Sequence, residues 1–284
     1  ASDSLSLVAG FRGQHNSRFV EHTALRINSL WQPASLGDYG FQWRASLGEG
    51  YRVPSLKENF YEFDHSAIGY MVLGNTDLVP ETSVTLTNTF TFELPISKSG
   101  LDIELSAYQS KAKDYILTVQ NNEKSAQESL SIYEYTNFDR VDIRGADFSI
   151  GQSEKMRWQI NYTYLDARNS HTDERLPERP RHQIKANIEW PITAKQSLLV
   201  YGTYEADKTA AKDADGLPKT IINSHYTTIN ARWAWRVTDA FTWRLGVDNI
   251  GNQHKDPTID EQSEFDIAPI SNRYVFTKLE YHLH

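Results

Sequence analysis

The chain is defined first by what it lacks. Its 284 residues contain no cysteine, so neither a disulfide framework nor a thiolate metal site can form. No run of about 18 apolar residues occurs, which excludes a membrane-spanning helix. The formal net charge is −8, and no basic patch with interleaved aromatic residues is present. Both features argue against a nucleic-acid partner.

Apolar and polar residues alternate along most of the chain, whereas no segment shows a convincing helical period. Residues 82–94 are a clear case, because Val84, Leu86 and Phe90 alternate with a ladder of threonines. The mean hydropathy is only −0.57. Strands of a membrane barrel show lipid only every second residue, so they dilute the hydropathy signal. A low mean value is therefore compatible with a membrane protein.

The alternation predicts about twelve strands, joined by connections that are short at one end and long at the other. We place the strands near residues 4–13, 18–30, 39–50, 81–94, 99–112, 140–151, 155–167, 181–191, 196–207, 223–236, 240–250 and 272–283. The long connections are 51–80, 113–139, 168–180, 208–222 and 251–271. This asymmetry is typical of bacterial outer-membrane barrels. A soluble β-sandwich or a β-helix is the alternative, but neither accounts for it.

The tryptophans are sorted in the same way, because all seven lie close to a short connection. They are Trp31, Trp43, Trp158, Trp190, Trp233, Trp235 and Trp243. An indole ring is apolar while its N–H needs water, which suits a lipid–water interface. We therefore predict an all-β fold, a transmembrane antiparallel up-and-down β-barrel in a Gram-negative outer membrane. The tryptophans would mark its periplasmic rim, opposite the extracellular long connections. A secretory leader, which such a protein needs upstream, is not seen at Ala1.

Four stretches together resemble the TonB-dependent outer-membrane receptors. The first is similar to the family's Phe-Arg-Ala-Pro-type box and reads Tyr51-Arg52-Val53-Pro54. The second is similar to its Asn-Pro-Asp-Leu-type box and reads Gly74-Asn75-Thr76-Asp77-Leu78-Val79-Pro80-Glu81. A third stretch resembles the segment that leads into a late strand, and it reads Leu176-Pro177-Glu178-Arg179-Pro180-Arg181-His182. The fourth resembles the turn before the last strand, and it reads Leu245-Gly246-Val247-Asp248-Asn249-Ile250-Gly251-Asn252. Val53 and Thr76 depart from the usual alanine and proline, which weakens any transfer of ligand identity.

The resemblance implies a barrel of about twenty-two strands that follows a plug domain. Twelve strands match the C-terminal half. We therefore interpret residues 1–284 as the C-terminal β-barrel region of such a receptor, with the plug domain and the N-terminal strands absent. The chain ends in Tyr281-His282-Leu283-His284 rather than in the family's usual terminal aromatic residue. A twelve-stranded barrel that closes on itself is the alternative, since an even strand count permits antiparallel closure.

The same resemblance implies energy-dependent uptake of a scarce nutrient, foremost a ferric siderophore or another iron chelate. A haem or cobalamin receptor of the same family and a passive porin-like channel are the alternatives. The expected partners are the chelate, outer-membrane lipid and the TonB–ExbB–ExbD complex acting through the plug. Such transport makes no covalent bonds, so we expect no enzyme activity, no cofactor and no metal ion of the protein's own. Asp64, His65 and Ser66 invite an enzymatic interpretation, but neighbours on an extended chain point to opposite faces.

The longest connection holds most of the candidate ligand-binding residues. Tyr61, Phe63, His65 and Tyr70 are able to stack on a flat iron-bearing ligand. In haem transporters of the family a histidine between the two boxes is an axial ligand, and His65 occupies that interval. The simpler alternative is an ordinary loop histidine packed against Tyr61 or Tyr70.

Two arginines near the predicted lumen, Arg52 and Arg181, are candidates for attracting an anionic chelate. Ion pairs with Glu58, Asp77 or Glu178 are the alternative for them. His171 and His254 in other long connections are weaker ligand candidates. The acidic run from Asp256 to Asp266 lacks the spacing of a calcium loop, so we expect a solvated loop there.

Overall fold

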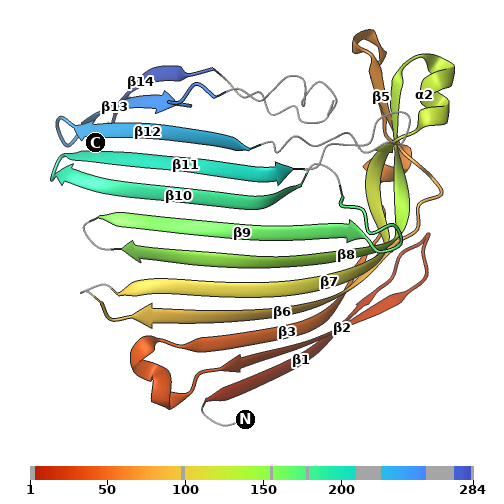
Figure 1. The fold of residues 1–284 in the computed structure, drawn as a ribbon, viewed down its shortest axis with the longest axis horizontal. Helices are drawn as coiled ribbons and strands as arrows, with labels where there is room; N and C mark the ends of the chain where they lie inside the picture. The colour runs from red at the N-terminus through yellow and green to blue at the C-terminus, as the bar shows by residue number, and fades with distance from the viewer. Residues whose placement is uncertain are drawn as a thin grey trace.

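The computed structural model describes residues 4–96, 100–153, 156–176, 179–208, 225–253 and 272–282. Twelve long antiparallel strands pair in chain order in one sheet (Figure 1). They are β1 (Leu5–Gln14), β2 (His22–Trp31), β3 (Gln42–Arg52), β6 (Glu81–Leu94), β7 (Leu101–Gln120), β8 (Ser131–Ser153), β9 (Arg157–Asn169), β10 (Pro180–Thr193), β11 (Gln196–Lys208), β12 (Tyr226–Arg236), β13 (Phe241–Asp248) and β14 (Tyr274–Tyr281). Each corresponds to one of the twelve predicted strands.

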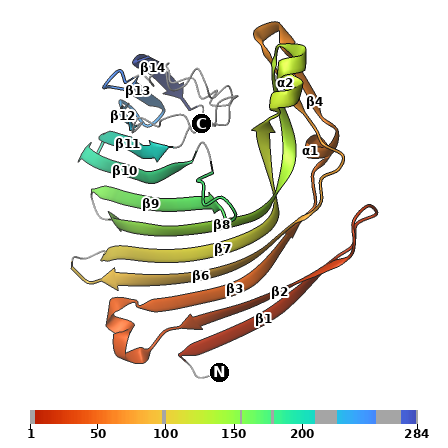
Figure 2. The same ribbon diagram turned by 45° about the vertical axis from the view of Figure 1, so that its right-hand side comes forward.

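The sheet curls into an open trough rather than a closed barrel (Figure 2). β1 and β14 stand at opposite ends of the strand order, and within the described residues they do not pair with each other. The alternative of a twelve-stranded barrel closed on itself is therefore wrong. Each end strand has only one neighbour, which leaves a row of backbone groups on its other side without a strand partner.

Cross-strand register separates an apolar face from a polar face. Phe90 lies opposite Leu105, which lies opposite Phe148 on the next strand, and Phe148 in turn lies opposite Tyr162. Since side chains alternate along a strand, the intervening residues on β6 form the threonine ladder of the other face. Large apolar side chains on the first face are exposed, as Leu105 shows with 46% of its surface accessible. This is the lipid face of a barrel wall.

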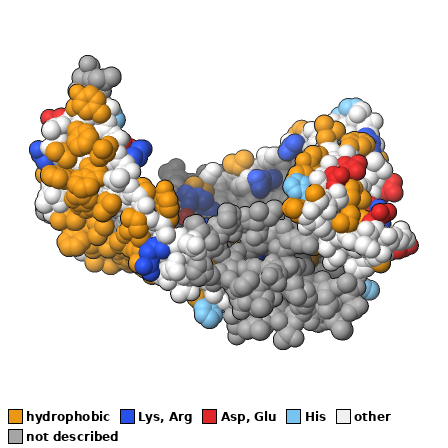
Figure 3. Space-filling view, turned by 90° about the horizontal axis from the view of Figure 1, so that it is seen from above, with side chains coloured by type: hydrophobic (Ala, Val, Ile, Leu, Met, Phe, Trp, Pro, Cys, Tyr) orange, Lys and Arg blue, Asp and Glu red, His pale blue; other side chains and the backbone are white. Residues whose placement is uncertain are grey.

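All seven tryptophans belong to this lipid face. Trp31 lies opposite Trp43, and Trp43 opposite Phe90. Trp235 lies opposite Trp243, and the register carries the same face through the intervening strands. In Figure 3 hydrophobic side chains cover much of the end where the short turns lie, at the left. The aromatic rim predicted from the sequence is confirmed.

The end with the long connections holds more structure than the alternation predicted. Residues 51–80 contain α1 (Leu56–Phe60), β4 (Glu62–His65), the 3-10 helix η2 (Ser66–Ile68) and β5 (Tyr70–Leu73). The expected loop at 113–139 is wrong, because β7 and β8 continue through it as a long hairpin with α2 (Asn122–Glu128) at its tip. β-Branched and aromatic residues favour a strand there. The connection between β2 and β3 carries the 3-10 helix η1 (Ala34–Tyr39). No helix among the described residues is long and apolar enough to cross a membrane.

Candidate ligand-binding site

The β4–β5 hairpin is an extension of the barrel wall. β4 pairs antiparallel with β5, and β5 pairs in parallel with the start of β8, where Tyr70 lies opposite Ser131 and Leu73 opposite Glu134. The hairpin stands at the long-connection end of the sheet (Figure 2). Its side chains are therefore held in place by a strand about sixty residues further along the chain.

The structure brings Tyr61, Phe63, His65 and Tyr70 together, and we call these four residues the aromatic cluster. Tyr61, Phe63 and His65 alternate along an extended segment and so share one face, and Tyr70 is the cross-strand partner of His65. The ring centroids are 5.8 Å apart for Tyr61 and Phe63, 4.0 Å for Phe63 and His65, and 5.2 Å for His65 and Tyr70. Tyr70 is buried, whereas Tyr61 keeps 43% of its surface exposed. Tyr61 is thus the most exposed ring of the aromatic cluster.

His65 packs by its ring against Phe63 and Tyr70, as the ordinary loop-histidine alternative expects. Asp64 points to the opposite face of β4 and accepts a hydrogen bond from the Ser66 backbone N–H at 2.9 Å. That hydrogen bond lowers the pKa of Asp64. Asp64, His65 and Ser66 therefore do not converge on one point in space.

Arg52 joins the first two of the four stretches that carry the family resemblance, 51–54 and 74–81. It is the cross-strand partner of Glu81, with 2.5 Å between Nε and Oε2, and its Nη1 lies 2.8 Å from Glu58 Oε2. Glu58 also closes a capping box with Ser55 at the start of α1. The predicted alternative of an ion pair with Glu58 is thus present, and a ligand-binding role for Arg52 stays a prediction.

Glu58 is charged at neutral pH despite being covered by the surrounding loop. Burial raises the pKa of Glu58, but hydrogen bonds from the Ser55 N–H and from Arg52 outweigh it, so the net shift is downward. The Ser55 N–H donates to Glu58 Oε2 at 2.7 Å. This carboxylate fixes both the start of α1 and the end of β3.

The second stretch, from Gly74 to Glu81, attaches the hairpin to β8. The Asn75 amide donates to the Tyr135 carbonyl at 2.9 Å, and Asn137 exchanges two hydrogen bonds with the Val79 backbone at 2.9 and 3.0 Å. Leu78 is 2% exposed. These hydrogen bonds hold the stretch against β8, so its residues position the aromatic cluster.

Arg181 lies at the start of β10, in a separate network over β9 to β11. It pairs with Asp166 at 3.0 Å and with Asp207 at 3.3 Å, and Arg175 pairs with the same Asp207 at 2.8 Å. Glu178, its predicted partner, lies outside the described residues, and Asp77 makes neither of the arginine ion pairs given above. The structure does not bring Arg181 into the aromatic cluster, and its ligand role stays a prediction.

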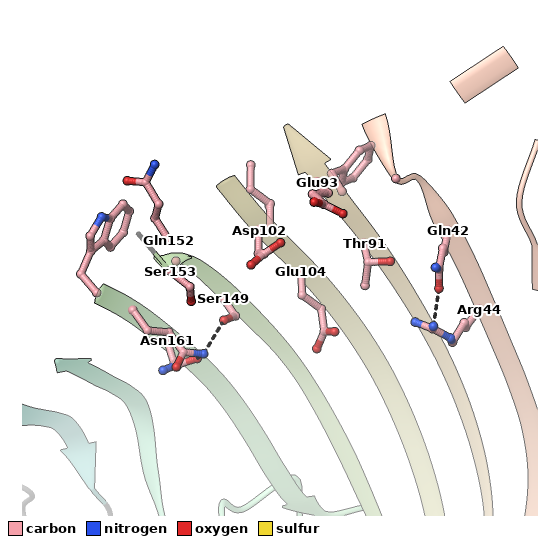
Figure 4. A pocket seen from close by; sticks show the side chains of 16 residues that line it. Gln42, Arg44, Thr91, Glu93, Asp102, Glu104, Ser149, Gln152, Ser153 and Asn161 are labelled. Carbon is pink, nitrogen blue, oxygen red and sulfur yellow. Dashed lines mark hydrogen bonds between the residues drawn. The ribbon is translucent and has the colours of Figure 1, made fainter. Parts of the chain in front are cut away.

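The polar face of the sheet carries a recess of about 630 Å³ near the short turns. Figure 4 shows Arg44, Glu93, Asp102 and Glu104 pointing into it from β3, β6 and β7. Glu93 and Asp102 lie directly opposite each other, and among the described residues neither forms an ion pair. Like charges in this position are destabilising unless something compensates them.

Weaker predicted ligand residues gain no partner from the structure. His171 lies in the exposed turn after β9, where its N–H donates to Asn169 Oδ1 at 2.8 Å. His254 and the acidic run from Asp256 to Asp266 lie outside the described residues. Within the described ranges, no group of three or more acidic or histidine side chains is arranged to hold a metal ion.

Sequence reasoning missed two cations beside the hairpin. Lys57 Nζ lies 5.6 Å from the centre of the Tyr61 ring. Arg18, at the tip of the β1–β2 connection, donates to Asn59 Oδ1 at 3.0 Å and to the Thr76 carbonyl, and it lies over Phe60. The Ser55-x-x-Glu58 capping signature identifies α1 and therefore places Lys57 next to Tyr61. Nothing local in the sequence places Arg18.

Comparison with known proteins agrees with this architecture. The family model described as "TonB dependent receptor-like, beta-barrel" matches residues 1–250. The chain belongs to this family. It is therefore a wall segment of an outer-membrane β-barrel of the TonB-dependent receptors.

Individual relatives are distant and much longer. An iron-regulated outer membrane virulence protein of Vibrio cholerae serotype O1 is 23% identical, over 89% of this chain and 39% of its own length. The vitamin B12 transporter BtuB of Photobacterium profundum is 22% identical, over 87% and 38%. The crystal structure of the siderophore receptor PirA from Acinetobacter baumannii superimposes with a TM-score of 0.70 at 19% identity, over 99% and 44%. The chain thus spans about two fifths of the length of the curated relatives it matches.

Proposed function

We propose that the chain is the C-terminal part of the barrel of a TonB-dependent receptor that imports a ferric siderophore or a similar iron chelate. The observation that carries this proposal is the aromatic cluster, held on a rigid hairpin at the long-connection end. Aromatic rings with one exposed member suit a ligand that offers flat, conjugated faces, as chelating aromatic groups do. Relatives named for iron regulation and for a siderophore support the same ligand class.

The free edges of the sheet support a larger barrel. Among the strands that the structure describes, β1 and β14 each have one neighbour, and a membrane does not tolerate an open sheet edge. Ten further strands, pairing with both edges, would complete a barrel of about twenty-two strands. The sheet then forms roughly half the wall.

The recess lined by Glu93, Asp102 and Glu104 supports a plug domain inside that barrel. These carboxylates face the lumen near the tryptophan rim, and the described residues offer them no ion pair. Basic groups of a plug domain would compensate them. The TonB complex would then release the ligand by acting on that plug from the periplasm.

Binding measurements on the complete receptor with a ring removed test the ligand proposal. Tyr61→Ala should weaken binding of a ferric siderophore by about 10-fold, because loss of a stacking ring costs roughly 1 kcal/mol beyond its buried area. Tyr39→Ala is the matched control, since Tyr39 is equally exposed (47%, against 43% for Tyr61) but lies on the opposite rim. Equal affinities of the two variants for every chelate tested would remove the aromatic cluster from the binding site.

Cobalamin is the second candidate, favoured by the similarity to the vitamin B12 transporter. Growth of a receptor-deletion strain on single iron sources, and separately on cobalamin, distinguishes the two classes. Restoration of cobalamin uptake alone by the complete receptor would replace the iron proposal. Passive conductance without any energy source would instead indicate a porin-like channel.

A further inference from the structure

The outward face of β7, β8 and β9 changes character along the strands. From the short turns upward, its cross-strand pairs are Ile103 with Ile150, Leu105 with Phe148, and Ala107 with Ala146. The next pairs are Gln109 with Arg144, Lys111 with Asp142, and Lys113 with Arg140. The lipid face is therefore apolar for three pairs and then polar for three.

Five cations lie in this upper, outward-facing part, and we call them the basic outer patch. They are Lys111, Lys113, Arg140, Arg144 and Arg168. The same part of the face holds two carboxylates, Asp142 and Asp166. Arg144 pairs with Asp142 at 2.8 Å and Arg168 with Asp166 at 2.9 Å. The carboxylates are thus already paired, and positive charge is left over.

The surplus charge is not used to hold the sheet together. Lys111 and Lys113 are exposed, and within the described residues neither makes an ion pair. Lys111 attracts Asp142 across the strands, but this carboxylate already pairs with Arg144. Lys113 lies directly opposite Arg140, and like charges in that position are destabilising. Arg140 is 65% exposed, and its nearest carboxylate, on Asp139, is 3.9 Å away. An anion lying over Lys113 and Arg140 would relieve this repulsion.

The height of the patch matches the second membrane interface. Trp158 and Arg168 face outward on the same strand, ten residues apart. At about 3.3 Å per residue and a tilt of about 40°, they are separated by about 25 Å along the membrane normal. This equals the height of the apolar band of an outer-membrane barrel. With Trp158 at one interface, the patch lies at the headgroups of the opposite leaflet.

A short aromatic rim lies directly below the patch. Tyr164 is the next outward residue below Asp166, and its cross-strand partner is His182. The Tyr162 hydroxyl and His182 Nδ1 are 2.9 Å apart. Amphipathic rings of this kind mark the boundary between acyl chains and headgroups.

We propose that the basic outer patch binds the phosphate groups of an anionic lipid in the leaflet beside the long connections. Lys111, Lys113 and Arg140 contact the phosphates, while acyl chains of the same lipid lie on the apolar pairs below. The lipid holds this part of the wall at a fixed depth beneath the ligand hairpin. The site does not depend on which nutrient the receptor imports.

Lipid retention by the complete receptor tests this assignment. The receptor is placed in phosphatidylcholine nanodiscs that contain an acylated, bisphosphorylated glucosamine disaccharide, and bound glycolipid is counted by native mass spectrometry. Lys111→Ala with Lys113→Ala should weaken retention about 30-fold, since each cation near an anionic surface contributes about 1 kcal/mol. The arginine version of the double variant should retain the lipid. Lys195→Ala with Arg236→Ala, two cations at the short-turn rim, should also leave retention unchanged.

Two further probes separate the sources of phosphate on the unaltered receptor, so the test does not depend on a variant folding. The same glycolipid without phosphates should be retained no better than phosphatidylcholine, and inorganic phosphate alone at millimolar concentration should not bind. Equal retention of the phosphate-free glycolipid would overturn the proposal, as would unchanged retention by the alanine variant. Binding of inorganic phosphate alone would overturn the assignment to a lipid.

Discussion

The two ends of this barrel wall are built by different kinds of interaction. At the short-turn rim the contacts are local, since Trp31 meets Trp43 across one turn at 6.2 Å and Trp235 meets Trp243 across another at 6.4 Å. At the long-connection end, β5 pairs with β8 and the Asn75 amide reaches the Tyr135 carbonyl. The rim is assembled by residues that are close in the sequence, whereas the long-connection end is assembled by segments about sixty residues apart.

This difference assigns different roles to the two ends. Side chains at the rim face lipid and tolerate change as long as they remain aromatic or apolar. The hairpin at the other end is packed more closely, since its Val72 is nearly inaccessible, as is Leu78 in the connection that follows it. It therefore behaves as a packed structure, in which one additional methyl group lowers stability.

The sharpest test of this contrast is a single methyl group added at either end. In Gly74→Ala the new Cβ would lie 2.7 Å from backbone atoms of Asn59 and Phe60, while at Gly37, on the rim, nothing lies within 4 Å. Backbone atoms cannot move aside as a flexible side chain does, so we expect Gly74→Ala to destabilise the hairpin by about 3 kcal/mol. Hydrogen exchange of the β5 amides in the complete receptor measures this.

Gly37→Ala is the matched control and should leave exchange unchanged at both ends. Equal effects of the two substitutions would show that the hairpin is as loosely packed as the rim. The comparison between the ends would then fail.

The extent to which the sequence predicts the fold follows the same division. Alternation places all twelve wall strands, and for β6 the predicted bounds 81–94 are those observed. It fails at residues 113–139, where β7 and β8 continue as a paired hairpin. The alternation of apolar and polar residues is interrupted there by Asp114, which adopts a positive φ of 54°, and by the helix α2 at the tip. Strand propensity is present in this segment, but without regular alternation it does not distinguish a strand from a loop.

The candidate site was predictable in its residue types but not in its geometry. The spacing of Tyr61, Phe63 and His65 already places them on one face of an extended segment. The parallel pairing of β5 with β8 depends on contacts distant in the sequence, as does the reach of Arg18 to Asn59. Without an observed pairing, local propensity cannot choose between a free loop and a rigid hairpin.

At the rim, we expect a substitution to cause a smaller loss of stability. Trp233 contacts Trp243 at 5.6 Å and Trp235 at 6.0 Å. Because lipid replaces the apolar contact area, Trp233→Ala loses mainly its ring–ring interactions, and we expect a cost of about 1–2 kcal/mol. Denaturant unfolding of the complete receptor in lipid vesicles measures this. Trp233→Phe should recover most of the lost stability. If Trp233→Ala destabilised the protein as much as Gly74→Ala does, the rim would be closely packed as well.

The smallest expected effect is a pH dependence of stability that is confined to the long-connection end. Glu58 has a lowered pKa because the Ser55 N–H and Arg52 hold its charged form against the effect of burial. The stability contributed by this carboxylate is complete above the ordinary glutamate pKa of about 4.3, and it is lost as the pH falls through the lower value of the folded state. Proteolysis of residues 54–80 by an acid-active protease should therefore accelerate below about pH 4.3, while the short-turn rim stays resistant.

Glu58→Gln removes the charged form at every pH, so it should make this segment labile throughout and abolish the pH step. Glu62→Gln, at an exposed position on β4, should keep the step. A step that persists in the Glu58 variant would mean that another group controls the hairpin, and the link between Arg52, Glu58 and the position of the aromatic cluster would be lost.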